Sequence, residues 1–372
     1  MKLTIERAAL LKSLAHVQSV VERRNTIPIL SNVRIEARKD SLGLTATDMD
    51  LAVVDTAPAQ VAQGGATTAP AHVLYDIVRK LPDGAQLELD NAGDSNHLRI
   101  RSGRSTFRLP CLPTEDFPVM AEGDLPSSFQ IAAADLRTLV DHSFFAISTE
   151  ETRYYLNGIF LHATARDGVK VLRAVATDGH RLARIESPLP AGAEAIPGVI
   201  VPRKTVAELR RLIDESTDTV RIALSDSKIR FAFDGAVITS KLIDGTFPDY
   251  ERVIPTGNDR ILEVDSRAFA NAVDRVSTIS SERSRAVKLS VKRGHLVLST
   301  TSPDNGSATE ELEVAYAGDD IDVGFNARYV LDITQQIEGD TLRLAFADAA
   351  SPTLASDVAD ASALYVLMPM RV

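Results

Sequence analysis

The chain alternates between two hydrophobic patterns along its whole length. In six segments apolar residues recur every three or four positions, as Leu10, Leu14 and Val17 do, and this spacing predicts an amphipathic helix. Short segments rich in β-branched and apolar residues follow each of them and predict strands. The predicted helices are Glu6–Val20, Ala71–Leu81, Ala134–Phe145, Lys204–Ile213, a segment that Ser266 is expected to cap, and Ala327–Ile337.

The predicted strands come in groups behind the helices, so the pattern indicates an α+β fold. They are Ile29–Ala37, Leu42–Ala46, Leu51–Ala57, Gln86–Leu89, Leu98–Ser102, Ser105–Leu109, Tyr155–Thr164, Val169–Ala176, a return strand that ends at Arg184, Val220–Leu224, Lys228–Phe233, Ala236–Ile243, Val287–Val291, His295–Thr300, Thr341–Phe346 and Leu364–Met368.

Two short markers show that this order of elements repeats. Thr47-Asp48 recurs at Thr177-Asp178 and Phe117-Pro118 recurs at Phe247-Pro248, both about 130 residues later. A third, more diverged copy begins at Ile261. We therefore predict three similar domains, each a duplicated helix-plus-strands unit, at residues 1–121, 122–255 and 256–372. Sheets left with free edges would pair with another domain or another chain, so the pattern favours a curved or closed assembly.

The most informative stretch is the hairpin from Val171 to Arg184. Its turn contains Asp178, His180 and Arg181, which together could act in general acid-base catalysis. No nucleophile elbow, glycine-rich phosphate loop or metal-ligand cluster accompanies them in the sequence. Turn formation explains Asp178-Gly179 better. We therefore expect neither an enzyme nor a metal site.

Composition limits the class of protein. The chain has 372 residues, 44% of them hydrophobic and 25% charged, as in globular proteins. Its one cysteine, Cys111, excludes an internal disulfide and fits a reducing compartment. The N-terminus has no apolar signal core and no window is long enough to span a bilayer, so we expect a cytoplasmic protein that does not bind membranes. A net charge of −10 argues against nucleic-acid binding, unless the positive charges gather on one surface.

Six motifs stand in order along the chain: Thr26-Ile27-Pro28-Ile29-Leu30, Arg153-Tyr154-Tyr155-Leu156-Asn157-Gly158, Ala176-Thr177-Asp178-Gly179-His180-Arg181-Leu182, Val201-Pro202-Arg203-Lys204, Phe247-Pro248-Asp249-Tyr250 and Tyr365-Val366-Leu367-Met368-Pro369-Met370-Arg371. Together they closely resemble those of the bacterial DNA polymerase III beta subunits, the sliding clamps. The resemblance covers essentially the whole chain.

The resemblance implies the DNA clamp fold and a head-to-tail homodimer that closes as a six-domain ring, with helices lining the hole. Such a ring encircles double-stranded DNA without sequence preference and is placed there by a clamp loader complex. It is a processivity factor for DNA replication, which tethers the replicative DNA polymerase alpha subunit and other proteins that carry clamp-binding peptides. It catalyses no reaction and needs no cofactor.

Basic residues on or beside the predicted helices would then face the DNA. Arg24 and Lys204 match DNA-contacting positions of the family most directly, and ordinary solvated helix faces are the alternative. A tyrosine of the pair Tyr154 and Tyr155 would contact DNA, unless the pair only packs at a strand edge. The predicted DNA-binding residues are Lys12, Arg24, Arg79, Lys80, Tyr154, Tyr155, Arg203, Lys204 and Arg210, with Arg23, Arg137 and Arg211 as further candidates.

The resemblance also implies a hydrophobic cleft for partner peptides, which present a glutamine and a pair of large apolar side chains. In it Gly179 would let the peptide backbone approach, and Arg181 and Arg252 would offer donors at the rim. The alternative is that the C-terminal run is only a core strand. The predicted cleft residues are Leu156, Thr177, Gly179, His180, Arg181, Leu182, Pro248, Arg252, Val253, Val366, Leu367, Met368, Pro369, Met370 and Arg371. The effect of Glu251 beside them is left open.

Ring closure would join the first domain to the third domain of a second chain. Phe107 and Ile279 match interface positions of the family, with Arg104 near acidic residues across the interface. Phe107 could equally be an internal core residue. The competing function is a peptide-binding scaffold that does not bind DNA, which would keep the cleft and lack the basic hole.

Overall fold

The computed structural model describes residues 1–91, 93, 96–121, 123–213, 218–233, 235–280 and 285–371. All six predicted helices are confirmed, with ends that shift by a few residues. They are α1 (Arg7–Gln18), α2 (Ala71–Lys80), α3 (Ala133–Phe144), α4 (Arg203–Ile213), α5 (Ser266–Ser277) and α6 (Ala327–Thr334). The cap predicted for α5 is wrong: Asp265, not Ser266, accepts a hydrogen bond from the Ala268 amide, at 2.7 Å.

The chain folds into two compact units. The first contains residues Met1–Leu136, Pro190–Pro197 and Lys204–Leu242, and the second contains Arg137–Leu189, Gly198–Arg203 and Ile243–Val372. Residues 122–255 are thus shared between the units, because their strands join two different sheets. The three-domain division, with its boundaries, stays a prediction.

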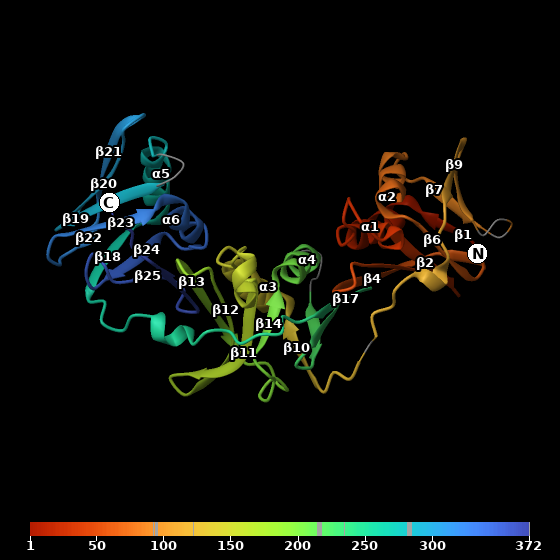
Figure 1. Ribbon diagram of the computed structural model, residues 1–372, viewed down its shortest axis with the longest axis horizontal. Helices are drawn as coiled ribbons and strands as arrows, with labels where there is room; N and C mark the ends of the chain where they lie inside the picture. Colours follow the sequence, from red (N-terminus) through yellow and green to blue (C-terminus); the bar gives the residue numbers. More distant parts are fainter. Residues whose placement is uncertain are drawn as a thin grey trace. The chain divides into compact units, whose positions relative to one another are not determined.

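The first unit has two antiparallel sheets. In spatial order, the five-stranded sheet consists of β5 (Gln60–Gln63), β1 (Lys2–Glu6), β7 (Gln86–Asp90), β8 (His97–Ser102) and β9 (Ser105–Pro110). The eight-stranded sheet consists of β10 (Ser127–Ala132), β15 (Thr219–Leu224), β16 (Lys228–Phe233), β17 (Ala236–Lys241), β4 (Leu51–Pro58), β3 (Ser41–Thr47), β2 (Asn32–Arg38) and β6 (Gly65–Pro70). In Figure 1, β17 lies beside β4, which makes one sheet from two distant parts of the sequence.

The second unit repeats this plan. Its nine-stranded sheet has the order β14 (Val199–Pro202), β11 (Gly158–Arg166), β12 (Val169–Thr177), β13 (Arg181–Pro188), β26 (Ala363–Leu367), β25 (Thr353–Asp357), β24 (Thr341–Phe346), β18 (Arg260–Asp265) and β22 (Ala315–Tyr316). Its four-stranded sheet consists of β21 (Gly306–Glu313), β20 (His295–Ser302), β19 (Ala286–Lys292) and β23 (Ile321–Asn326). Short 3₁₀ helices connect the elements: η1 (Pro28–Ser31), η2 (Thr114–Asp116), η3 (Glu151–Leu156) and η4 (Tyr250–Val253).

Pairs of helices cover one side of the sheets. Helices α1 and α2 contact each other, as do α5 and α6. In Figure 1 the two helices of each pair lie side by side. The predicted apolar face of α1 is confirmed, because Leu10, Leu14 and Val17 are completely buried. Within the described ranges, the helices are too short or too polar to cross a bilayer.

Strands without an apolar run escaped the pattern analysis. The clearest case is β21, whose residues alternate between half-buried and exposed and include Glu310, Glu311 and Glu313. It is an edge strand, and edge strands tolerate charge because only one neighbour covers them. The predicted strand Tyr155–Thr164 begins too early: the structure starts β11 at Gly158, and Tyr155 belongs to η3.

Candidate partner-binding and DNA-contacting sites

The hairpin between β12 and β13 is closed by its own side chains. The Thr177 hydroxyl donates to the Arg181 carbonyl at 2.7 Å, and the Gly179 amide donates to that hydroxyl at 3.1 Å. Asp178 Oδ1 accepts from the amides of His180, at 2.9 Å, and Arg181, at 3.0 Å. The carboxylate therefore stabilises the turn, which supports the structural interpretation of Asp178.

Gly179 is required by the shape of this turn. Its φ of +88° lies in the left-handed region, and a Cβ there would come within 2.6 Å of Arg153 Nη1. Arg153 itself is held by Glu150, whose carboxylate accepts from its Nε at 2.8 Å. Sequence reasoning did not select Arg153 as a site residue, although it stands in the same motif as Tyr154.

The C-terminal strand β26 extends the hairpin as a third strand. Leu367 pairs with Arg181 and Val366 pairs with Leu182. Beyond the strand, the Met368 amide donates to the His180 carbonyl at 2.9 Å. The Met370 amide donates to a carbonyl of β23 at the same distance. The backbone of the tail is therefore held on both sides while Met368 remains 40% exposed.

A buried apolar cluster brings together three segments of the predicted cleft. Phe160 packs against it, with its ring stacked on Phe247 at a centroid distance of 5.0 Å. Pro248 and Val253, which is 51% exposed, lie on the surface. The buried members of this cluster, which we call the apolar cluster, are Leu156, Val175, Leu182, Ile200, Phe247, Tyr250 and Val366. Of these the sequence analysis selected Leu156, Leu182 and Val366; Val175, Ile200 and Phe247 are apolar core positions, and Tyr250 is a core tyrosine that it quoted only within a motif.

The role predicted for Arg181 is wrong. Its side chain is 9% exposed and its guanidinium is fully engaged: Nε donates to Asp178 at 3.1 Å, Nη1 pairs with Asp332, and Nη2 donates to the Phe145 carbonyl at 2.8 Å. It also lies 4.4 Å from the ring centroid of Tyr329. Arg181 joins the hairpin to α6 and is not a free donor at a rim.

Arg252 is exposed, as a rim residue should be. Its Nε donates to Asp249 at 2.7 Å and its side chain remains 84% accessible. Its neighbour Glu251 accepts from Arg173 Nη1 at 2.7 Å. Of the remaining predicted cleft residues, His180 and Arg371 are exposed, Thr177, Pro369 and Met370 are half-buried, and Leu367 is buried. That these residues form a peptide cleft stays a prediction.

Most of the predicted DNA-contacting residues are accessible. Lys12 on α1, Arg24 after it, and Arg79 and Lys80 at the end of α2 are exposed, whereas Lys204 and Arg210 on α4 are half-buried. Exposure is needed for contact with phosphates but does not demonstrate it.

Lys204 and Arg211 have structural partners. Lys204 Nζ pairs with Asp48 and lies 3.4 Å from Glu22. Arg211 donates to two carbonyls at the C-terminal end of α1, those of Ala15 at 2.8 Å and His16 at 2.6 Å. These donors cap α1, so Arg211 has a structural role, while 34% of its side chain stays accessible and its place on a DNA-facing surface stays a prediction.

In the second unit, Tyr154 is 54% exposed while Tyr155 is half-buried, and their rings meet edge to face at 5.8 Å. Tyr154 is thus the member of the pair that a ligand could reach. Arg203 lies over the ring of Phe144, 4.4 Å from its centroid, and donates to the Ile147 carbonyl at 3.2 Å.

The two predicted interface residues lie beside free sheet edges. Phe107 is half-buried on β9, an edge strand of the five-stranded sheet. Ile279 is half-buried just after α5, which contacts the edge strand β21. In the described part of the chain, no group of three or more His, Cys, Asp or Glu side chains could hold a metal ion.

Three consecutive parts of the chain match domains of one protein family. Residues 1–121, 130–249 and 251–371 match the N-terminal, central and C-terminal domains of the DNA polymerase III beta subunit. The chain belongs to this family. The beta sliding clamps of Caulobacter vibrioides and Escherichia coli K12 are 56% and 37% identical to it, each over 100% of both chains.

Solved structures of sliding clamps have the same fold as this chain. A Caulobacter crescentus beta sliding clamp is 56% identical, with a TM-score of 0.97 over 100% of this chain and 99% of that one. A sliding clamp from Bartonella birtlesii, bound to griselimycin, is 50% identical, with a TM-score of 0.97 over 100% of both chains. This DNA polymerase III beta subunit family member has the DNA clamp fold. It acts as a DNA polymerase processivity factor and is not an enzyme.

Proposed function

We propose that two copies of this chain join head to tail into a closed ring around double-stranded DNA. The observation that carries this proposal is the way in which the sheets are joined within the chain. In the first unit β17 pairs with β4, and in the second unit β26 pairs with β13, both antiparallel. In each junction, the last strand of one repeat pairs with a strand of the preceding repeat. That strand is the one that ends the first helix-plus-strands half of the preceding repeat.

The same pairing pattern leaves two strands at sheet edges, β9 and β21. In the first repeat the last strand is β9, and in the third repeat the strand that ends the first half is β21; both lie at sheet edges. Pairing β9 with β21 of a second chain would make a third junction of the same kind and remove two exposed edges. Two such contacts close a symmetric dimer.

Charge and apolar surface support this junction. Strand β9 contains Arg108 and follows Arg104, whereas β21 contains three glutamates. Phe107 and Ile279 are half-buried and would supply its apolar centre. The three clamp domains of each chain would be residues 1–121, 122–255 and 256–372.

The basic residues predicted above would face the DNA and contact its phosphates. Because a closed ring is retained by topology, weak contacts suffice and leave it free to slide. The apolar cluster, with Met368 and Val253 beside it, would receive the peptides of the replicative polymerase alpha subunit, the clamp loader complex and other partners.

The first test is the mass of the protein in solution and its retention on DNA. Sedimentation should give a dimer, twice the chain mass of 40.2 kDa. After a clamp loader has placed it on circular DNA, it should stay there and be lost when the circle is cut. A monomer, or equal loss from circular and linear DNA, would contradict the ring and favour a peptide-binding scaffold without DNA.

A charge-removal variant tests the DNA-facing residues. Arg24→Gln with Lys80→Gln should reduce loading onto DNA several-fold, because each removed charge weakens phosphate contact. Both side chains are exposed in the first unit, so stability should not change. Peptide binding by the same variant should also stay normal. Unchanged loading at low salt would contradict the assignment of these residues.

A further inference from the structure

One arginine beside the apolar cluster, Arg184, has a buried guanidinium nitrogen without a hydrogen-bond partner among the described residues. On β13, Leu182 and Arg184 are two positions apart, so their side chains lie on the same face of the sheet. Across the neighbouring strand Arg184 pairs with Val175, and both Val175 and Leu182 belong to the apolar cluster. Arg184 therefore lies at the border of the site proposed for partner peptides.

The charges around Arg184 do not satisfy it. Its Nε is buried and has no hydrogen-bond partner among the described residues. Its ion pair, with Glu186 Oε1, is long at 3.6 Å. The same carboxylate already accepts from Arg173 Nε, at 2.8 Å, and from Arg166 Nη1, at 3.2 Å. Three arginines thus share one buried carboxylate.

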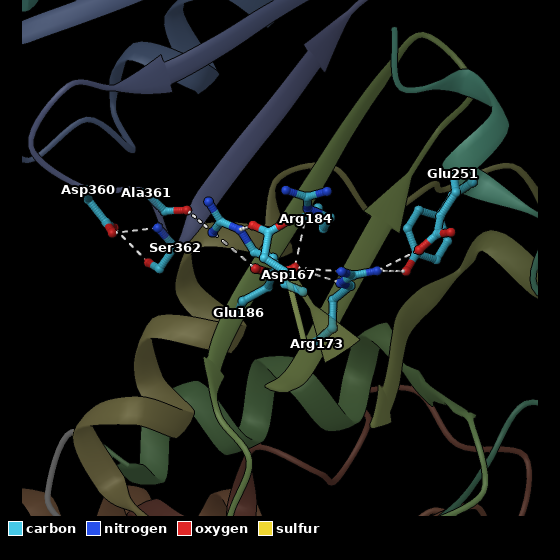
Figure 2. Close-up of polar contacts among 10 residues, drawn as sticks. Asp167, Arg173, Arg184, Glu186, Glu251, Asp360, Ala361 and Ser362 are labelled. Atoms are coloured by element: carbon cyan, nitrogen blue, oxygen red, sulfur yellow. Dashed lines mark hydrogen bonds and ion pairs between the residues drawn. The ribbon is translucent and has the colours of Figure 1, made fainter. Parts of the chain in front are cut away.

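The second nearby carboxylate does not solve this problem. Figure 2 shows Arg173 between Glu186 and Glu251, and Arg173 Nη1 donates to both Glu251 and the Tyr250 hydroxyl at 2.7 Å. Glu251 therefore pairs with Arg173 and not with Arg184. Burial, together with the positive charges of Arg173 and Arg166, lowers the pKa of Arg184, although Glu186 opposes the shift. Asp167 lies beside Arg166, at 3.8 Å, so each nearby carboxylate pairs with another arginine, and an additional one would give the buried Nε of Arg184 an acceptor.

The first sheet junction shows that the fold does not need an arginine here. In both junctions the register is the same: Ala52 pairs with Thr239 and Val54 with Val237, as Leu182 pairs with Val366 and Arg184 with Leu364. The residue that corresponds to Arg184 is therefore Val54.

The partners of Arg184 are also absent from the first junction. The residues that correspond to Arg173 and Glu186 are Gly43 and Thr56, which pair with each other across β3 and β4 as Arg173 and Glu186 do across β12 and β13. A half-buried charge that the fold does not require, and that lacks a full set of acceptors, is costly to keep.

We propose that Arg184 binds a carboxylate of the peptide that occupies the predicted cleft, and so selects partners with an acidic group beside their large apolar side chains. A guanidinium can bind a carboxylate through two parallel hydrogen bonds, and 19% of this side chain is accessible. The inference rests on the proposed peptide cleft. The carboxylate can come from an aspartate or glutamate or from the end of a peptide chain.

The test compares short synthetic peptides that contain a glutamine, a leucine and a phenylalanine. One set carries a single aspartate, moved through the positions around the apolar pair, and a second set carries asparagine instead. A third has no acidic side chain but ends in a free carboxylate or an amide. Each carboxylate peptide is compared with its neutral partner, which has asparagine or an amide in the same place. In at least one such pair, the carboxylate peptide should bind the full-length protein about tenfold more tightly, and salt should reduce the difference.

Variants assign that difference to Arg184. Arg184→Val, which introduces the residue found at the corresponding position of the first junction, should remove the preference for the carboxylate peptide over its neutral partner. Arg184→Gln should do the same if Val disturbs folding. The matched control is Arg221→Val, which removes the same charge from an exposed strand position in the other unit and should preserve the preference.

The outcomes separate the two proposals. If every carboxylate peptide and its neutral partner bind the wild type equally, or if the preference survives both Arg184 variants, the inference is wrong and the cleft stands. If no peptide of any set binds the wild-type protein, the proposed cleft itself fails, and with it the basis of this inference.

Discussion

Two hairpins, one in each compact unit, have the same turn and different surroundings. In the first, the Thr47 hydroxyl donates to the Leu51 carbonyl at 2.9 Å, and Asp48 Oδ1 accepts from the amides of Asp50, at 3.0 Å, and Leu51, at 2.7 Å. The second makes the corresponding bonds with Thr177 and Asp178. The Thr-Asp pair therefore closes the turn in the same way in both hairpins.

The strands that complete the two hairpins differ in character. At the first, Lys241 donates its amide to the Asp50 carbonyl and its Nζ to the Asp50 carboxylate, both at 2.8 Å. At the second, the corresponding residue is Met368, whose amide makes the same backbone bond while its side chain is exposed. One junction is thus closed by an ion pair, and the other presents apolar surface. Side chains on a shared backbone therefore give the two junctions different surfaces, and the predicted peptide cleft lies at the second.

The largest expected effect comes from Arg181, which occupies the position of Leu51. Arg181→Leu should destabilise the protein by about 3 kcal/mol, because it leaves the carboxylates of Asp332 and Asp178 without their buried partner. Urea unfolding measures this. The control is Arg252→Leu, whose exposed ion pair should contribute less than about 1 kcal/mol. Equal effects of the two substitutions would show that Arg181 has no special role.

A smaller effect should follow from Leu182→Ala, which introduces the residue found at position 52. Leu182 is 2% exposed, so the cavity should cost about 2 kcal/mol of stability, and peptide affinity should fall about tenfold. Val253→Ala is the control. Its exposed side chain can contact a peptide but does not support the core, so this substitution should leave the stability unchanged. Normal peptide affinity of a folded Leu182→Ala protein would argue against the predicted cleft.

The smallest effect concerns Lys204, which joins α4 to the first hairpin. Burial disfavours its charge, but hydrogen bonds to Asp48 and Glu22 outweigh burial and raise the pKa of Lys204. A raised pKa means that the protonated form stabilises the folded state. That stabilisation is fully present below the unfolded pKa of about 10.4 and is lost as pH rises through the higher folded pKa.

Lys204→Met should therefore reduce stability by less than about 1 kcal/mol at neutral pH, because the side chain is 39% exposed and solvent screens the pair. The difference between wild type and variant should shrink above about pH 10. Urea unfolding at several pH values measures it, with the exposed Lys80→Met as control. A difference that stays constant into the alkaline range would contradict the role of this ion pair.

Much of the fold could be predicted because it depends on local periodicity. The spacing of Leu10, Leu14 and Val17 requires one buried face in any context, and the Thr-Asp turns close through bonds within five residues. The repeated markers at Asp48 and Asp178 therefore predicted a repeated unit. Strand β21 was missed because an edge strand needs no apolar run.

The helices, the repeated turns and the family resemblance follow from the sequence alone, since each depends on residues close together in the chain or on several motifs in order. Which charges are free depends on tertiary contacts. Arg181 looked like a rim donor and is buried against α6, Arg211 caps α1, and Arg184 lacks a full set of acceptors. Their partners lie far away in sequence, and pairing between distant charges follows from strand register and helix packing, which no local pattern encodes.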